Sequence, residues 1–386
     1  MDIGLTVGMA AAAFFACAWW ASTYSYDYAA GAPIDPKSQI RLLRQENIEG
    51  RKTRYSLVPI AVKDLPNTHY TALSYTWGSA SGQRHNFELR PGKERLGQRV
   101  RITENLRDFL EVYKSNTAPG TSDLIYVDAL CINQEDMEER SQQVLLMHQV
   151  YSHANKTIVW LGRGKPDVNV SLANLHRGLA SNNRYLPSDY KTAIQDICNQ
   201  KYWERLWVVQ ECLLSGNTEI WYRKNSFLWR DIDMLVQQCD IARPGRYNRW
   251  TMEMKARNIF DAKRELYSQF TGTFGLTMKD AIRRFGRQKC SDGRDHVYAL
   301  LGIIKDLAID VRYDAEWSFE KMIEQVLRQV LKEICDDPTT VVGKEMEDFR
   351  RFVEFMQNEV PLSGADARSL GFEASKINKE MLDPVS

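Results

Sequence analysis

The chain has 386 residues, which is enough for one large domain or two ordinary ones. Hydrophobic residues make up 44% of the sequence and charged residues 26%, a balance typical of globular proteins. The formal net charge is +1, so no global field recruits nucleic acid. The seven cysteines are widely spaced and form no CxxC pair, which argues against a disulfide framework and favours a reducing compartment.

The first 22 residues differ in composition from the rest of the chain. Residues 3–20 carry no charged side chain, a run about long enough to cross a bilayer. The segment lacks the basic start of a secretory signal, and its alanines and glycines make it weakly hydrophobic. Three interpretations stay open: a membrane anchor, an uncleaved signal-like segment, or a loose apolar helix. Because the cysteine pattern argues against export, we expect a cytoplasmic protein, with membrane contact through residues 1–22 if they form an anchor.

A linker at residues 23–38 leads into a part of the chain that alternates strands with helices. Pro59 places its strand at a sheet edge, and Thr103 is a suitable helix cap. The sequence predicts strands at residues 40–43, 55–60, 71–76, 124–127, 157–161 and 218–222. It predicts helices at residues 103–113, 169–180, 188–199 and 202–214, and another that follows residue 134 and ends at about residue 153. The order of strand, helix and strand between residues 124 and 161 indicates a parallel crossover.

Beyond residue 229 the pattern becomes helical. Helices are predicted at residues 229–241, 250–268, 277–286, 293–303, 317–335 and 345–358, followed by a polar tail. An Arg/Pro/Gly stretch at residues 242–247 is the best internal break. The sequence therefore predicts an α/β domain with a mainly parallel sheet at residues 39–241 and an α-helical region at 242–386.

Ligands of open parallel sheets bind beyond the carboxyl ends of the strands. Two predicted strands end in polar or flexible residues. After the first, Ser74, Tyr75 and Thr76 offer hydroxyls, Trp77 offers a stacking surface and Gly78 lets the backbone turn. After the second, Asp128 offers an acceptor, and Asn133 and Gln134 offer amides. They match the lining of a nucleotide or sugar pocket. The alternative is a network that only ties loops down, with Asn133 capping the following helix ahead of Asp136.

The stretch at residues 202–214 is predicted to form one short helix that ends before Gly216. On such a helix Glu211 neighbours Trp207, Val208 and Leu214, so its carboxylate lies on a mostly apolar face. A carboxylate that loses hydration must find donors or take up a proton. It is either part of a core salt bridge, for example with Arg205, or held ready for chemistry.

Several other kinds of site are not indicated. GxxxxGK[ST] is absent and no GxGxxG follows a strand, so no phosphate loop is predicted. The sequence contains no HExxH, and the six histidines show no metal-ligand spacing. Cys131 with His148 or His153 is a weak candidate for a thiol nucleophile. We therefore expect no metal and no bound cofactor.

Three blocks of the sequence resemble the fungal HET (heterokaryon incompatibility) domain family. The first is YTALSYTWG at residues 70–78, the second is VDALCINQ at 127–134 with its continuation to 162, and the third is YWERLWVVQE at 202–211. The segment DGRDHVYALLG at residues 292–302 looks like the one commonly found after this domain. The resemblance covers roughly residues 39–335.

The resemblance implies a role in fungal non-self recognition, in which such domains trigger growth arrest or cell death, through self-association or a protein partner. It also implies a TIR-like (flavodoxin-like) fold, because HET domains are thought to be distant relatives of TIR domains. Some TIR domains cleave NAD through a glutamate in a Trp-Cys-x-x-Glu-type motif. The spacing of Trp207 and Glu211 is the same, with Val208 where TIR domains often have Cys.

Carried over to this sequence, the resemblance makes Glu211 the catalytic residue of an NAD(P) glycohydrolase. The polar residues at the strand ends, with Arg205 and Trp207, then bind an NAD(P) substrate. A carboxylate there stabilises the oxocarbenium-like ribosyl cation that remains when nicotinamide leaves. The alternative is a non-enzymatic signalling or assembly module in which Glu211 is structural.

Overall fold

The computed structural model describes residues 26–48, 52–78, 82–90, 97–118, 121–164, 169–180, 190–241, 254–268, 275–305, 309–337 and 344–382. The apolar segment at residues 1–22 and the predicted break at 242–247 both lie outside these residues. Across the ranges just given, no helix is both long and apolar enough to cross a bilayer.

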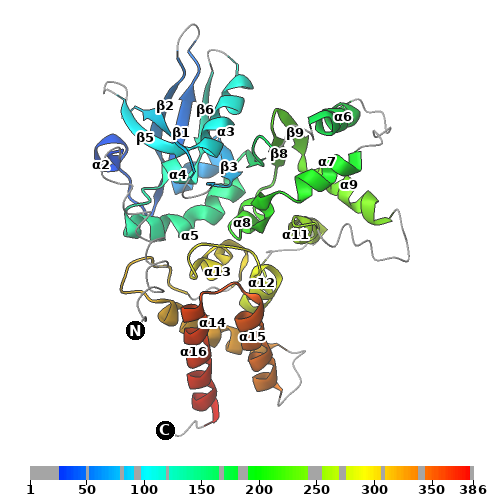
Figure 1. The fold of residues 1–386 in the computed structure, drawn as a ribbon. Coiled ribbons are helices and arrows are strands. Elements are labelled where there is room, and N and C mark those ends of the chain that lie inside the picture. Colours follow the sequence, from blue (N-terminus) through cyan, green and yellow to red (C-terminus); the bar gives the residue numbers. More distant parts are fainter. Residues whose placement is uncertain are drawn as a thin grey trace, which may run out of the picture.

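A seven-stranded sheet forms the centre of the first half of the chain (Figure 1). In spatial order its strands are β2 (Arg54–Ala61), β1 (Gln39–Glu46), β6 (Ser122–Tyr126), β3 (Thr71–Tyr75), β7 (Lys156–Trp160), β8 (Thr218–Tyr222) and β9 (Asn225–Leu228). The central strands β6, β3, β7 and β8 run parallel, while β1, β2 and β9 pair antiparallel at the two sides. The predicted α/β fold class and strands are confirmed; the TIR-like label stays a prediction.

Burial along the strands explains this order. All residues of β3 are buried, as are the last four of β7, so these apolar strands occupy the centre of the sheet. Pro59 has no N–H to donate, and its strand β2 lies at the edge as predicted.

A second, two-stranded sheet was not predicted. Its strands β4 (Arg84–Leu89) and β5 (Gln98–Thr103) pair antiparallel. Charged and polar residues dominate both strands, and each has only two alternating apolar residues, so the hydrophobic signal there is short.

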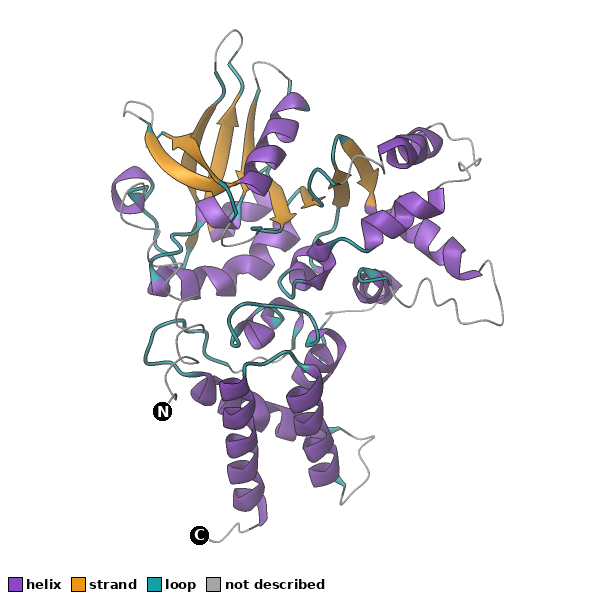
Figure 2. Cartoon of the chain, viewed as in Figure 1, coloured by secondary structure: helices purple, strands orange, loops and turns teal. Residues whose placement is uncertain are grey.

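The helices lie on both faces of the large sheet and fill the second half of the chain (Figure 2). The helical segments of the described residues are α2 (Tyr28–Gly31), η1 (Val62–Asn67), α3 (Glu104–Ser115), α4 (Asp128–Cys131), α5 (Met137–His153), α6 (Asn169–Ala180), α7 (Tyr190–Cys198), η3 (Lys201–Glu204), α8 (Val208–Leu213), α9 (Trp229–Ile241), α11 (Arg257–Ser268), α12 (Met278–Phe285), α13 (Asp295–Tyr298), η4 (Leu301–Ile303), α14 (Phe319–Asp336), α15 (Glu345–Glu359) and α16 (Gly364–Leu382).

The faces of the sheet are distinguished by their aromatic and polar side chains. Phe109 of α3 packs on Trp160 of β7, with ring centroids 5.9 Å apart. Tyr75 is in register with Trp160 and therefore points to the same face. Ser74 points to the opposite face, which is covered by α5 and α8.

Side-chain caps fix where the helices around the sheet begin. Thr103 caps α3, as predicted, by accepting a hydrogen bond from the backbone N–H of Leu106. The predicted Asn133 cap of the next helix is wrong. Asp136 caps α5 instead and accepts from two backbone N–H groups of its first turn, because the helix starts three residues later than Asn133 would require.

The predicted single helix over residues 202–214 is also wrong. A 3₁₀ turn, η3, ends at Glu204, and α8 begins only at Val208. Between them Arg205 has extended backbone angles of φ −80° and ψ 137°. Backbone hydrogen bonds to Lys289 stabilise this break, because Leu206 N donates to Lys289 O at 3.0 Å and Lys289 N donates to Glu204 O at 2.6 Å.

The C-terminal part is helical as predicted, with three differences. The helix predicted at residues 250–268 is described only from Arg257. The helix predicted at 293–303 is split into α13 and η4. The predicted polar tail is wrong, because α16 covers residues 364–382 and packs on α14 and α15 through an apolar stripe that includes Leu370 and Ile377.

A buried ion pair joins β1 to α5. Arg41 makes two contacts with Glu139, at 2.6 and 3.1 Å, and both side chains are less than a tenth exposed. Arg41 also donates to the carbonyls of Ala32 and Cys131. Glu139 additionally accepts from the backbone N–H of Asn133 at 2.6 Å, so the pair fixes the loop after β6.

Candidate functional site

The loops after β3 and β6 meet at the carboxyl ends of the parallel strands. The indole Nε1 of Trp77 donates to Asp128 Oδ2 at 2.9 Å, and Gln134 Nε2 donates to the carbonyl of Asp128 at 3.1 Å. Trp77 is 36% exposed, so one aromatic surface of this group faces solvent. The structure therefore brings together three residues that the sequence placed at this edge.

Glu211 lies on α8, which packs on the face of β3 to which Ser74 points. Its side chain accepts a hydrogen bond from the Ser74 hydroxyl, which is also hydrogen bonded to the Tyr202 hydroxyl. Glu211 is 2% exposed and Ser74 is fully buried. Ser74 and Glu211, both predicted as site residues, are thus in direct contact in the interior of the protein.

Burial dominates the electrostatics of the two carboxyl groups. It raises the pKa of Glu211 from 4.5 to about 7, with the Arg205 guanidinium and the Ser74 hydrogen bond opposing this rise and the Asp128 charge adding to it. The pKa of Asp128 is also raised by burial, against the opposing effects of Arg205 and the Trp77 hydrogen bond. Glu211 is thus able to exchange a proton near neutral pH.

Arg205 lies at the break before α8 and interacts electrostatically with both carboxyl groups. Its Nη1 donates to the carbonyl of Tyr75, the last residue of β3. Arg205 and Glu211 are both described and no ion pair joins them, so the alternative of a core salt bridge with Arg205 is not realised. The guanidinium instead acts as a positive group shared by Asp128 and Glu211.

Other residues predicted for the site lie apart from Glu211. Tyr75 points to the α3 face, where its buried hydroxyl has no hydrogen-bond partner among the described residues and burial keeps its pKa well above the usual value. The side chain of Asn133 accepts from Glu135 N at 3.3 Å, which is a local turn. Gly78 has φ +83°, a conformation that favours glycine.

Trp207 points away from the strand ends toward the C-terminal region. Its indole Nε1 donates to Asp295 Oδ2 at 3.1 Å, and Tyr313 donates to the other oxygen at 2.6 Å. Tyr202, Asp295 and Tyr313 were not predicted as site residues. The acidic residues among apolar ones in the segment at 292–302 were the available signal for Asp295.

A separate cavity of about 630 Å³ opens near the amino ends of the parallel strands. It is lined by residues of β1, β6 and the end of α3, with Lys156 and Trp221. Its charged groups are of both signs and include Arg44 and Glu46. This cavity does not contain Glu211 or any other residue predicted for the site.

The described residues contain no group of three or more His, Cys, Asp or Glu side chains that could hold a metal ion. Cys131 is buried, and burial raises its thiol pKa to about 12, so it is poorly suited to act as a nucleophile. The carboxyl groups of Asp128 and Glu211, both influenced by Arg205, are therefore the candidates for chemistry at this site.

Comparison with known proteins defines the class of this domain. Residues 70–211 match the model of the heterokaryon incompatibility protein (HET) family. The match runs from the residue before β3 to Glu211 on α8, and so spans every residue of the predicted site. The HET assignment applies to these residues, which make up less than half of the chain.

A curated relative points to the same family. Heterokaryon incompatibility protein 6, OR allele, of Neurospora crassa is 32% identical over 155 residues, which are 38% of this chain. The match spans 22% of that protein's own length. No solved structure matches the chain.

Proposed function

We propose that the chain is an effector of heterokaryon incompatibility, the recognition of non-self in fungi that ends in growth arrest or cell death. The support is the HET match over residues 70–211 and the name of the relative from Neurospora crassa. Since the chain spans about a fifth of that relative, the role of the whole relative enters as part of the proposal.

The proposed activity is hydrolysis of NAD(P) at the bond between nicotinamide and ribose. In this reaction NAD⁺ and water give ADP-ribose, nicotinamide and a proton. As the glycosidic bond breaks, the electron pair leaves with nicotinamide and positive charge develops on the ribosyl group. A carboxylate in surroundings of low polarity stabilises such a charge more strongly than one in water.

The observation that carries this activity is the state of Glu211. A buried glutamate with a pKa of about 7, beside a serine hydroxyl and a shared arginine, combines features found at catalytic carboxyl groups. In the proposed reaction Glu211 exchanges its Ser74 hydrogen bond for one to a ribose hydroxyl. The exposed indole of Trp77 then offers a surface on which a ring of the substrate stacks.

The test is NAD turnover by the purified full chain over a series of protein concentrations. Wild type is compared with Glu211→Gln, which keeps the side-chain shape but removes the charge, and with Glu135→Gln, a change at an exposed glutamate. We expect nicotinamide release by wild type and by Glu135→Gln, and none by a folded Glu211→Gln protein. Release that survives in Glu211→Gln would remove Glu211 from the catalytic role.

The burial of Glu211 favours a second candidate, a non-enzymatic signalling or assembly module. With 2% exposure and a hydrogen bond to Ser74, the carboxyl is also suited to hold α8 against the sheet. This candidate predicts no nicotinamide release at any concentration, together with self-association or capture of a protein partner. Sedimentation over the same concentration series measures the self-association.

We also propose a cytoplasmic location, with residues 1–22 as a membrane contact. The support is the uncharged run at residues 3–20 and the cysteine pattern of the sequence. Fractionation of a fluorescent fusion with and without residues 1–22 tests the contact. An unchanged soluble pool would end this part of the proposal.

A further inference from the structure

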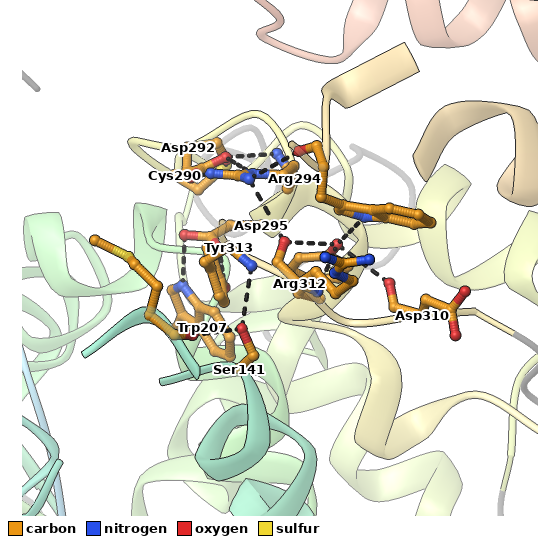
Figure 3. A network of polar contacts seen from close by, with 12 residues as sticks. Ser141, Trp207, Cys290, Asp292, Arg294, Asp295, Asp310, Arg312 and Tyr313 are labelled. Carbon is orange, nitrogen blue, oxygen red and sulfur yellow. Dashed lines mark hydrogen bonds and ion pairs between the residues drawn. The ribbon is translucent and has the colours of Figure 1, made fainter. Parts of the chain in front are cut away.

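A segment of the C-terminal region is hydrogen bonded to Trp207, the residue that precedes α8. Figure 3 shows Trp207, Asp295 and Tyr313 pointing toward one another. One carboxylate oxygen of Asp295 accepts from the Trp207 indole at 3.1 Å, and the other accepts from the Tyr313 hydroxyl at 2.6 Å. Asp295 is 4% exposed, so both bonds are shielded from water. These three residues are called the Asp295 clamp.

The clamp is anchored on α5, outside the segment that carries it. The backbone N–H of Tyr313 donates to Ser141 Oγ at 3.1 Å. The Arg140 guanidinium lies over the Tyr313 ring at 3.8 Å from its centroid. Arg294, which is paired with Asp292, lies over the same ring at 5.2 Å. Tyr313 therefore offers Asp295 a hydroxyl whose position is fixed from several sides.

The clamp acts on Glu211 through the backbone. Trp207 is the residue before α8, and its carbonyl accepts from the Glu211 N–H at 3.4 Å. No side chain caps the start of α8, which has only six residues. Helices this short depend on contacts outside themselves for stability. The hydrogen bond from the Trp207 indole to Asp295 is such a contact. Trp207 in turn accepts the backbone hydrogen bond of Glu211, so the contact is linked directly to the backbone of that residue.

We propose that Asp295 is a positioning residue that, through Trp207, holds the start of α8 and so keeps Glu211 beside Ser74. Asp295 lies on the far side of Trp207 and does not touch the substrate of the proposed reaction. The effect on NAD turnover rests on the proposed function, whereas the effect on α8 does not.

Amide hydrogen exchange of the full chain tests the effect on α8. The variants are Trp207→Phe, which removes the indole N–H, and Asp295→Ala, which removes its acceptor. The matched control is Trp221→Phe, which removes an indole bond of 2.8 Å to Glu219 on the α3 face of the sheet, opposite to α8. We expect amides at residues 208–213 to exchange at least about tenfold faster in both clamp variants, a factor that corresponds to about 1.4 kcal/mol, and at the wild-type rate in the control.

The double variant adds a second criterion. If both residues act through one bond, Trp207→Phe with Asp295→Ala exchanges no faster than the more strongly affected single variant. Unchanged exchange at residues 208–213 in the single variants would overturn the proposal. An equal acceleration over the whole chain would overturn it as well, because that result describes a general loss of stability.

Kinetics test the effect on Glu211. We expect kcat for NAD cleavage to fall at least about tenfold in Trp207→Phe with KM nearly unchanged, and Asp295→Asn to retain much of the activity because its amide oxygen still accepts from the indole. Faster exchange of α8 with an unchanged kcat would refute positioning. If wild type cleaves no NAD, the proposed function fails, and the exchange experiment alone decides whether the clamp exists.

Discussion

Replacing Glu211 by glutamine is expected to stabilise the protein at alkaline pH and to change how its stability depends on pH. Burial raises the pKa of Glu211 from 4.5 to about 7, so the folded protein keeps a proton there that the unfolded chain has released. The stabilisation from the protonated carboxyl is complete below pH 4.5 and is lost as pH rises through about 7. Glutamine stays neutral throughout and does not show this loss.

The size of the effect follows from the pKa difference. At about 1.36 kcal/mol for each unit of pKa, a rise from 4.5 to about 7 corresponds to about 3 kcal/mol. Most of this, about 2–3 kcal/mol, is lost between pH 5 and pH 8. The free energy of unfolding of wild type should therefore fall by about that much more than that of Glu211→Gln over this range.

Urea unfolding followed by tryptophan fluorescence at several pH values from 5 to 8 measures both free energies. Carboxyl groups that do not interact with Glu211 titrate equally in the two proteins, so their difference reports the titration of Glu211 together with its coupling to Asp128. The exposed control Glu135→Gln should run parallel to wild type within about 0.5 kcal/mol. A Glu211→Gln profile that also runs parallel to wild type would refute the assignment of a raised pKa to Glu211.

Three further predictions concern the scaffold of the site, and urea unfolding at pH 7 measures each. Glu139→Ala leaves Arg41 buried without its partner and should cost about 3–5 kcal/mol; a loss below about 1 kcal/mol would contradict the pair's role. Asp136→Ala removes the cap of α5 and should cost about 1 kcal/mol, whereas Asp136→Asn should cost much less because asparagine also caps. Gly78→Ala should cost about 1–2 kcal/mol because of the positive φ alone, since a Cβ there meets no atom within 4 Å; equal stability would contradict that backbone conformation.

The parallel strands could be predicted because each carries its own signal. The strands that contain Leu73, Ile125 and Val159 are short apolar runs, and all three residues are fully or almost fully buried in the centre of the sheet. Thr103 is both the predicted and the observed cap of α3. In these places local composition and the final fold favour the same structure.

The failures occur where distant parts of the chain decide the local structure. Arg205 interrupts a helical pattern because Lys289, 84 residues later, pairs with the backbone on both sides of it. No local signal in residues 202–214 encodes that contact. The strands β4 and β5 were missed for another reason, since the apolar face of each is only two residues long, Phe87 and Leu89 in β4 and Val100 and Ile102 in β5.

The candidate site could be predicted only in part for the same reason. The strand ends place Ser74 and Asp128 at one edge, and the spacing from Trp207 singles out Glu211. Tyr202, which completes the hydrogen bonds of Ser74, begins the third block that resembles the HET family, but nothing in its residue type or spacing marks it as a partner of Ser74. Its role depends on how the turn before Arg205 is folded.

Two buried glutamates of this chain show how a structural carboxylate differs from one that is available for chemistry. Glu139 accepts two bonds from Arg41 and one from Asn133, so its charge is compensated within the core. Glu211 accepts from a neutral hydroxyl, with Arg205 acting without a direct ion pair, so the rise in pKa that burial causes is only partly offset. A carboxyl kept in this state lowers stability at neutral pH, a cost typical of functional groups and unnecessary for a helix that only packs. This contrast is the physical reason to test Glu211 first as a catalytic residue.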